Sequence, residues 1–164
     1  MVLGTAGSFA QPQHYPSRPV RIITAEAGGG NDFTARLVAQ GLTASLGQPV
    51  IVENRGGAGG AIAAELVSRA LPDGHTLILY GSNFYTLPLL KKVPYDVLKD
   101  FEPVTAVGST PNILVVHPSL PVTSVKDLIA LAKSKPGELN YSSGGAGGSN
   151  HLGGELFRTL AGVN

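Results

Sequence analysis

The chain of 164 residues contains neither cysteine nor tryptophan, and only 14% of its residues are charged. Without cysteine, disulfide bonds, thiolate metal sites and cysteine nucleophiles are excluded. The net charge is +1 and no basic cluster occurs, which argues against a surface that binds nucleic acid. The longest apolar runs fall short of the ~18 residues that cross a membrane, so the chain is not expected to span one.

The sequence also lacks the motifs of the commoner nucleotide-binding and hydrolytic sites. The pattern G-x-G-x-x-G fails because Ile62 stands where the third glycine belongs, and neither a P-loop lysine nor the pattern G-x-S-x-G occurs. The four histidines are scattered without the spacing of a metal site, and His75, in the turn after Pro72, is expected to be exposed. We therefore expect no metal and no cofactor, and a binding protein is favoured over an enzyme.

Glycine, by contrast, is abundant, with 22 residues, and it recurs in one arrangement. Three times, a short apolar run leads into a glycine cluster and then into a segment with helical periodicity. The clusters are Gly28–Gly30 after the run 19–24, Gly56–Gly60 after 49–53, and Gly144–Gly148 after 138–142. A strand that enters a helix through glycine leaves bare backbone N–H groups at the positive end of the helix dipole, where an anion binds well.

The three glycine loops differ in the side chains that accompany them. The first offers backbone amides alone, whereas the third adds serine hydroxyls and an imidazole at Ser142, Ser143, Ser149 and His151. Either loop could instead be a tight turn between a strand and a helix. In the second loop, Arg55 could clamp a carboxylate, but pairing with Glu53 or exposure to solvent is the favoured interpretation.

The alternation of strands and helices predicts a parallel α/β sheet. The expected strands are 20–24, 50–52, 76–80, 104–107, 113–116 and 139–141, and the expected helices are 31–46, 61–70, 87–92, 124–133 and a last one from 150. Periodicity places apolar side chains of the first and last helices in the core: Phe33, Leu37, Val38, Leu42, Leu152, Leu156, Phe157 and Leu160. The expected N-caps are Asn31 or Asp32, Ser124 and Asn150.

The first residues have the character of a targeting segment. Residues 1–14 resemble the end of a secretory signal peptide, with small residues placed for cleavage after Ala10. This interpretation implies export to the periplasm, and a disordered leader is the alternative.

Several longer motifs stand in order along the chain. They are Gly28-Gly-Gly-Asn-Asp32, Leu46-Gly-Gln-Pro-Val-Ile-Val-Glu-Asn-Arg55, Pro72-Asp-Gly-His-Thr-Leu77, Pro94-Tyr-Asp96, Val115-Val-His-Pro-Ser-Leu-Pro121, Pro136-Gly-Glu-Leu-Asn-Tyr141 and His151-Leu-Gly-Gly-Glu-Leu-Phe157. With this order and spacing, the sequence from Tyr15 to Asn164 resembles the Bug-type extracytoplasmic solute receptors, the substrate-binding proteins of tripartite tricarboxylate transporters.

The resemblance implies an α/β fold of the periplasmic-binding-protein type (type II), with two lobes that close on a ligand. Because members of this family run to about double the present length, the second lobe is expected to be truncated. The expected organisation is lobe 1 over 15–108, an interlobe crossing over 109–111 and a partial lobe 2 over 112–164.

The resemblance further implies that a small organic anion, typically a carboxylate, is held between the lobes for delivery to membrane transporter subunits, without catalysis. The first and third glycine loops, one on each lobe, would hold it through backbone amides and waters. The expected substrate-binding residues, which include a polar lip after the third strand, are Gly28, Gly29, Gly30, Asn31, Asp32, Ser82, Asn83, Ser142, Ser143, Gly144, Gly147, Ser149, Asn150 and His151.

Two questions stay open at the level of the sequence. Glu26, beside the first loop, would repel an anion unless it is turned away, and it could instead favour a less charged or amino-bearing ligand. The alternatives to a receptor are an α/β enzyme that acts on a small anionic substrate and a truncated fragment that binds nothing.

Overall fold

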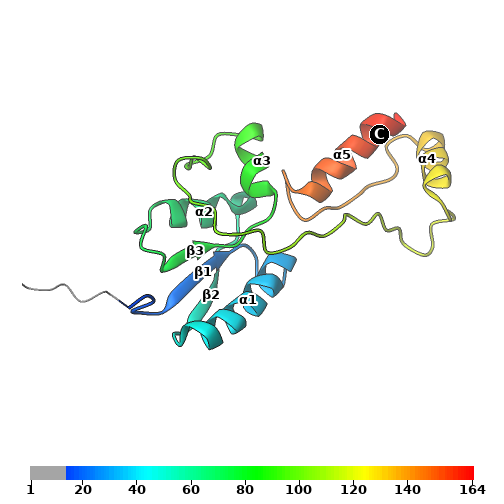
Figure 1. Cartoon of the computed structure of the whole chain (residues 1–164). Coiled ribbons are helices and arrows are strands. Elements are labelled where there is room, and N and C mark those ends of the chain that lie inside the picture. Colours follow the sequence, from blue (N-terminus) through cyan, green and yellow to red (C-terminus); the bar gives the residue numbers. More distant parts are fainter. Residues whose placement is uncertain (1–13) are drawn as a thin grey trace, which may run out of the picture.

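The computed structural model describes residues 14–164. Residues 14–100 form a sheet unit, which is followed by a long connection and two further helices (Figure 1). The signal-peptide interpretation falls almost entirely outside these residues. The elements are β1 (Val20–Thr24), α1 (Gly30–Leu46), β2 (Val50–Asn54), the short 3-10 helix η1 (Ala58–Gly60), α2 (Ala61–Ser68), β3 (Thr76–Ile78), α3 (Asn83–Leu90), α4 (Val125–Ser134) and α5 (Ser149–Ala161).

The three strands form a parallel sheet in the order β2-β1-β3. Val20 pairs with Val50, and Ile22 lies between Val52 on one side and Leu77 on the other. A further bond from the Leu79 amide to the Ile23 carbonyl, at 3.0 Å, extends the ladder beyond β3. The predicted strands 20–24, 50–52 and 76–80 are therefore confirmed as the sheet. Parallel pairing brings their carboxyl ends, and the loops that follow, to one edge.

Helices cover both faces of the sheet and form two cores. On one face, Ile22 packs against Ala35 and Ala39 of α1, with Val38 and Leu42 beside them. The predicted inward positions of Val38 and Leu42 are confirmed. Phe33 and Leu37 were predicted to be buried, but they are 66% and 55% exposed. The face of α1 against the sheet is formed by small alanines, which lets the helix lie close to the strands and turns the two larger side chains to solvent.

The opposite face is covered by α2 and α3, where Ala64, Phe84, Leu87 and Tyr95 form the second core. Pro88 lies inside α3 and has no N–H to donate to the Phe84 carbonyl one turn earlier. The Tyr95 hydroxyl donates to that carbonyl instead, at 3.1 Å. Its ring also stacks on Phe84, with centroids 5.5 Å apart. Tyr95 therefore replaces the backbone bond that the proline removes. The helix exists as predicted but begins earlier, at Asn83.

The segment that leaves the sheet unit does not form the strands predicted at 104–107 and 113–116. Its backbone carries no regular structure over 101–117, and its β-branched residues are exposed, with Val104 at 82%, Ile113 at 78% and Val115 at 79%. The prediction for 139–141 is wrong for the same reason. A strand exists only when a neighbouring strand takes its backbone hydrogen bonds, and the described residues place none beside these segments. Two of the three glycine units therefore contain a strand.

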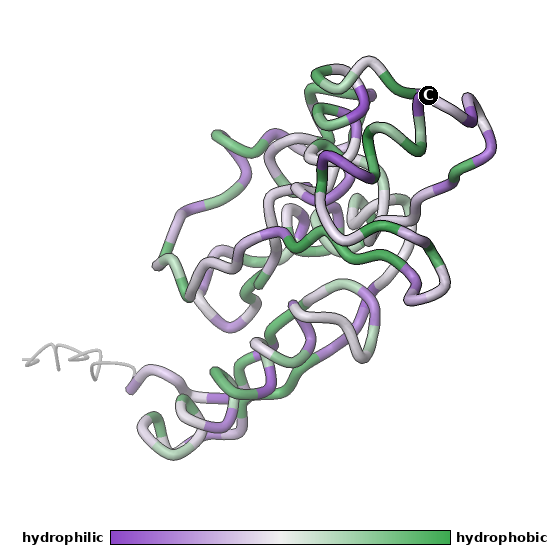
Figure 2. Tube along the Cα trace, turned by 90° about the vertical axis from the view of Figure 1, so that its right-hand side faces the viewer, coloured by the Kyte–Doolittle hydropathy of each residue, from purple (hydrophilic) through white to green (hydrophobic). Residues whose placement is uncertain are grey.

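The last two helices lie beyond this connection. Ser124 caps α4 as predicted, since its Oγ accepts the Asp127 amide at 3.1 Å. Along α5, Leu156 and Leu160 are 58% and 78% exposed, which contradicts their predicted burial. The periodicity of α5 was identified correctly, but within the described residues no sheet face lies against it. Figure 2 shows hydrophobic stretches, in green, spread along the trace and also close to the marked C-terminus.

Candidate functional site

The candidate site lies at the edge of the sheet where the strands end. The first glycine loop follows Thr24, the second follows Asn54, and the segment Gly81–Asn83 follows β3. The hydroxyls of Thr24 and Tyr80 are buried near this edge without a partner among residues 14–164. Buried polar groups are normally paired, so this edge has unused capacity for hydrogen bonds.

Asp32 organises the first loop. Its carboxylate accepts the Gly28 amide and the Asn54 side-chain amide, both at 2.9 Å, and it pairs with Arg36 at 3.0 Å. These three donors, led by the Gly28 amide, lower the pKa of Asp32 to about 2. The side chain is buried and its charge is satisfied within the protein. Asp32, a predicted site residue, therefore stabilises the conformation of the first loop.

The start of α1 presents its backbone amides without a capping side chain. The N-cap is Gly29, so the predicted cap at Asn31 or Asp32 is wrong: the Asp32 side chain turns back to Gly28 instead. The first-turn amides of a helix have no acceptor within the helix, and a glycine cap supplies none. Gly28, Gly29 and Gly30 are all exposed. The amides of Gly30 and Asn31 are therefore open donors at the positive end of a 17-residue helix.

Glu26 is turned toward the second loop. Its carboxylate accepts the Gly57 amide at 3.2 Å and lies against Gly56, where an added Cβ would be 3.1 Å from the Glu26 Cγ. Beside it, Gly60 leaves the space that the Tyr80 hydroxyl fills, because a Cβ there would lie 1.7 Å from that oxygen. The second loop is thus filled by the protein's own side chains.

Arg55 supports the same conclusion, since it pairs with Glu53 at 3.1 Å. Glu53 also pairs with Arg21, and these two cations lower the pKa of its carboxyl. The structural interpretation of Arg55 is confirmed.

The third loop is organised partly by its own side chains. The predicted N-cap of α5 at Asn150 is wrong, because the N-cap is Gly148. The side-chain amide of Asn150 lies against Gly144 and Gly148. His151 Nδ1 accepts the Gly147 amide at 3.4 Å. Ser142 and Ser143 lie exposed on the loop, away from the start of α5 in sequence.

The segment Gly81–Asn83 lies between the first and third loops. A Cβ at Gly81 would be 3.6 Å from the Asn31 side chain and 3.5 Å from that of Asn83. Ser82 Oγ accepts the Ser149 amide at 3.1 Å. The structure therefore brings Asn31, Ser82, Asn83 and Ser149 into one neighbourhood. Within residues 14–164, no hydrogen bond joins Ser142 or Ser143 to these four residues.

Sequence reasoning missed two residues that hold the third loop. Thr86 on α3 donates to the Gly147 carbonyl, and Asn112 forms two hydrogen bonds with Ser149. The signal for Asn112 was available, because it is a polar residue at the head of the apolar run Ile113–Val116. Thr86 carried no such signal.

Other candidate positions lie elsewhere. His75 was expected to be exposed, but it is 7% exposed at the start of β3, packed under Tyr15 and bonded to Asp73. Across residues 14–164, no group of three or more possible metal ligands comes together. Among the same residues, no helix has both the length and the apolar character needed to cross a membrane.

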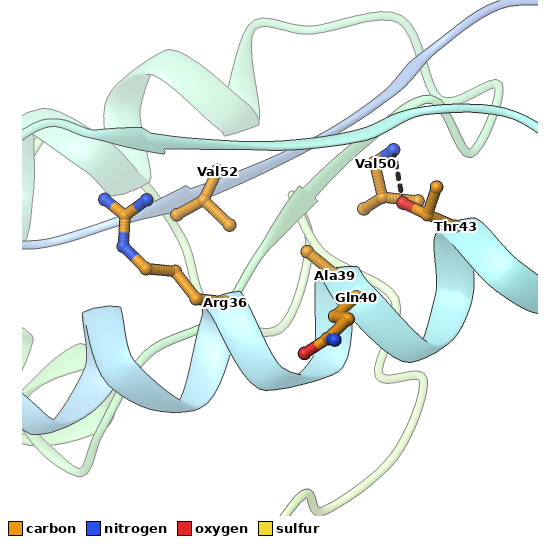
Figure 3. Close-up of a pocket in the computed structure, with 6 residues that line it drawn as sticks. All are labelled: Arg36, Ala39, Gln40, Thr43, Val50 and Val52. Carbon is orange, nitrogen blue, oxygen red and sulfur yellow. Dashed lines mark hydrogen bonds between the residues drawn. The ribbon is translucent and has the colours of Figure 1, made fainter.

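A cavity of about 380 Å³ opens between α1 and β2 (Figure 3). It is lined by Arg36, Ala39, Gln40, Thr43, Val50 and Val52, and none of the predicted site residues lines it. Arg36, at one end, is engaged by Asp32 and Asn54. The cavity therefore shares no predicted site residue with the candidate site and adjoins it through Arg36.

Comparison with known proteins gives a consistent result. Residues 34–164 match the family described as the tripartite tricarboxylate transporter family receptor, TctC. The protein BugT of Bordetella pertussis is 41% identical over 170 residues, covering 99% of this chain and 52% of BugT. The chain thus spans about half the length of the curated relatives it matches.

Solved structures agree with these sequence matches. An R. palustris protein solved with adipate is 39% identical with a TM-score of 0.88, and MatC from Rhodopseudomonas palustris with bound malate is 33% identical with a TM-score of 0.81. Each match covers 92% of this chain and about half of the other. The fold is that of the α/β periplasmic binding proteins, as the resemblance implied. The chain belongs to the TctC family of tripartite tricarboxylate transporter receptors.

Proposed function

We propose that this chain carries part of the binding site of an exported solute receptor that captures a small organic anion with at least one carboxylate. The observation that carries the proposal is the pair of helix starts, α1 and α5, whose N-cap residues Gly29 and Gly148 have no side chain to cap them. At α5, Ser82 Oγ accepts the Ser149 amide and Asn150 Oδ1 accepts the His151 amide. Helix-start amides are aligned donors for an anion. The segment Gly81–Asn83 contacts the neighbourhood of both.

The chemistry of the ligand follows from what surrounds these amides. The charge of Asp32 is compensated by Arg36, and the Glu26 carboxylate is directed to the Gly57 amide of the second loop. Adipate and malate, which two related solved structures hold, are both dicarboxylates. Delivery to membrane transporter subunits, a periplasmic location and the absence of catalysis are parts of the same proposal.

Isothermal titration of the chain with adipate, malate and the uncharged diamide of adipate tests this function. We expect saturable binding of at least one dicarboxylate and none of the diamide. Binding of the diamide as tightly as adipate, or no binding of any carboxylate in a panel of di- and tricarboxylates, would contradict the proposal.

A proline at the first helical position removes one open amide without breaking the helix. The extended backbone at Gly29 suits a following proline, and nothing lies within 4 Å of a Cβ at Gly30. We expect Gly30→Pro to weaken dicarboxylate binding by about 5–10-fold, the effect of one hydrogen bond to a charged group. Val125→Pro, the same change at the start of α4, is the matched control and should leave binding unchanged. Equal effects of the two variants would place the ligand elsewhere.

A further inference from the structure

The start of α5 is fastened to a helix of the sheet unit that lies more than 60 positions earlier in the chain. Thr86 of α3 donates to the Gly147 carbonyl, and the Ser149 amide donates to Ser82 Oγ at 3.1 Å. Gly147 is buried against α3, where an added Cβ would lie 3.3 Å from Leu90 Cδ1. The third loop is therefore seated on α3 at close range.

The backbone amide, the hydroxyl and the carbonyl of Ser149 each form a hydrogen bond with a residue outside α5. Its amide is bonded to Ser82, its hydroxyl donates to Asn112 Oδ1 at 3.2 Å, and its carbonyl accepts Asn112 Nδ2 at 3.1 Å. Asn112 holds the side chain and the carbonyl, whereas Ser82 holds only the amide. Ser82 therefore occupies the Ser149 amide, which the proposed function needs as a donor, whereas Asn112 leaves that amide free.

We propose that Ser82 and the ligand compete for the Ser149 amide, while Asn112 is a positioning residue that keeps Ser149 in place for both. This inference rests on the proposed function. The Ser82 hydroxyl is a neutral acceptor, and a carboxylate oxygen forms a stronger, charge-assisted bond with the same N–H. The Ser82 hydroxyl therefore accepts the Ser149 amide when no ligand is bound. A carboxylate displaces this hydroxyl, whereas a weaker acceptor does not.

The competition predicts opposite effects from two substitutions that each remove hydrogen bonds from the same serine. Titration with adipate should give a Kd that falls by about 3–5-fold in Ser82→Ala and rises by at least as much in Asn112→Ala. A merely structural role would weaken binding in both. Ser134→Ala on α4, which removes only a local bond to the Leu131 carbonyl, is the control and should bind as the wild type does.

A second measurement tests the Ser82 bond without any ligand. Hydrogen exchange at the Ser149 amide should be faster in Ser82→Ala than in the wild type, and unchanged in Ser134→Ala. Unchanged exchange in Ser82→Ala would overturn the inference, as would adipate binding that is weaker in Ser82→Ala than in the wild type, because Ser82 would then be a ligand contact. If neither adipate nor malate binds the wild type or Ser82→Ala, the proposed function itself fails and the competition fails with it.

Discussion

Asp32 is the residue on which the geometry of the first loop depends. Its carboxylate joins the Gly28 amide, the Asn54 side chain and Arg36, which belong to the loop, the second strand and the first helix. A carboxylate with several such donors remains ionised at far lower pH than usual, in keeping with its pKa of about 2. The negative charge of Asp32 holds the loop in shape, and its three donors are all groups of the protein itself.

This arrangement predicts how stability depends on pH. The folded pKa of Asp32 lies below its unfolded value of about 3.9, so its contribution is complete above that value and is lost as pH falls toward about 2. We expect Asp32→Asn to lower the thermal midpoint at pH 7, and the gap from the wild type to narrow between about pH 4 and pH 2. Glu102→Gln, an exposed carboxylate, is the control. A gap that stays constant with pH would show that the charge of Asp32 contributes nothing.

At the scale of elements, α3 shows how one side chain rescues a helix with a proline in it. Replacing Tyr95 by phenylalanine keeps the ring on Phe84 but leaves the Phe84 carbonyl buried without its donor. We expect Tyr95→Phe to reduce the free energy of unfolding by about 1–3 kcal/mol in urea denaturation. Tyr85→Phe, at a side chain that is 59% exposed, should change it by less than about 0.5 kcal/mol. Similar losses in the two variants would mean that the Tyr95 hydroxyl is dispensable.

The apolar face of α5 provides a second test at this scale. Leu87 on α3 is 1% exposed and Leu160 on α5 is 78% exposed, although both occupy apolar positions of a helix. Leu87→Ala should cost about 2–5 kcal/mol of stability, and Leu160→Ala less than about 0.5 kcal/mol. A large loss from Leu160→Ala would instead show that α5 is covered in solution.

These elements also show what could be predicted from the sequence. The sheet strands, the glycine-led helix starts and the Ser124 cap follow from local patterns, because β-branched runs, glycine and capping residues act over a few positions. The inward face of α1 was predicted wrongly at Phe33, because periodicity cannot tell that Ala35 and Ala39 form the closer contact. The strands at 104–107 and 113–116 failed because pairing depends on a neighbouring strand, which no local pattern encodes.

The site was predictable to a similar degree. The glycines and Ser149 were identified from the orphan amides that such loops create, and the role of Arg55 from its neighbour Glu53. The hydrogen bonds of Asp32 and Glu26 could not be predicted, since each carboxylate has a partner that only the fold brings close. Asn112 is another such case, because its bonds to Ser149 span 37 positions of sequence.

At the scale of the whole molecule, the sheet unit and the third loop meet through α3 and the segment Gly81–Asn83. Gly81 lies near the Asn31 side chain and Ser82 bonds to Ser149, and that the first and third loops oppose each other across a ligand stays a prediction. The second loop is closed by Glu26 and Tyr80. Three similar glycine loops therefore differ in a way that the number of glycines alone does not reveal: side chains fill the second loop, and the first and third are those that we propose bind the ligand.

The most direct test of the central claim is to follow the backbone amides of the isotope-labelled chain by nuclear magnetic resonance during a titration with adipate. The account predicts saturable shifts at Gly30, Asn31, Ser149 and Asn150, at the starts of α1 and α5. The amides of Val125 and Lys126, at the serine-capped start of α4, should not move. Shifts that are absent from both glycine-led helix starts, or that appear equally at α4, would contradict the claim that these starts hold the ligand.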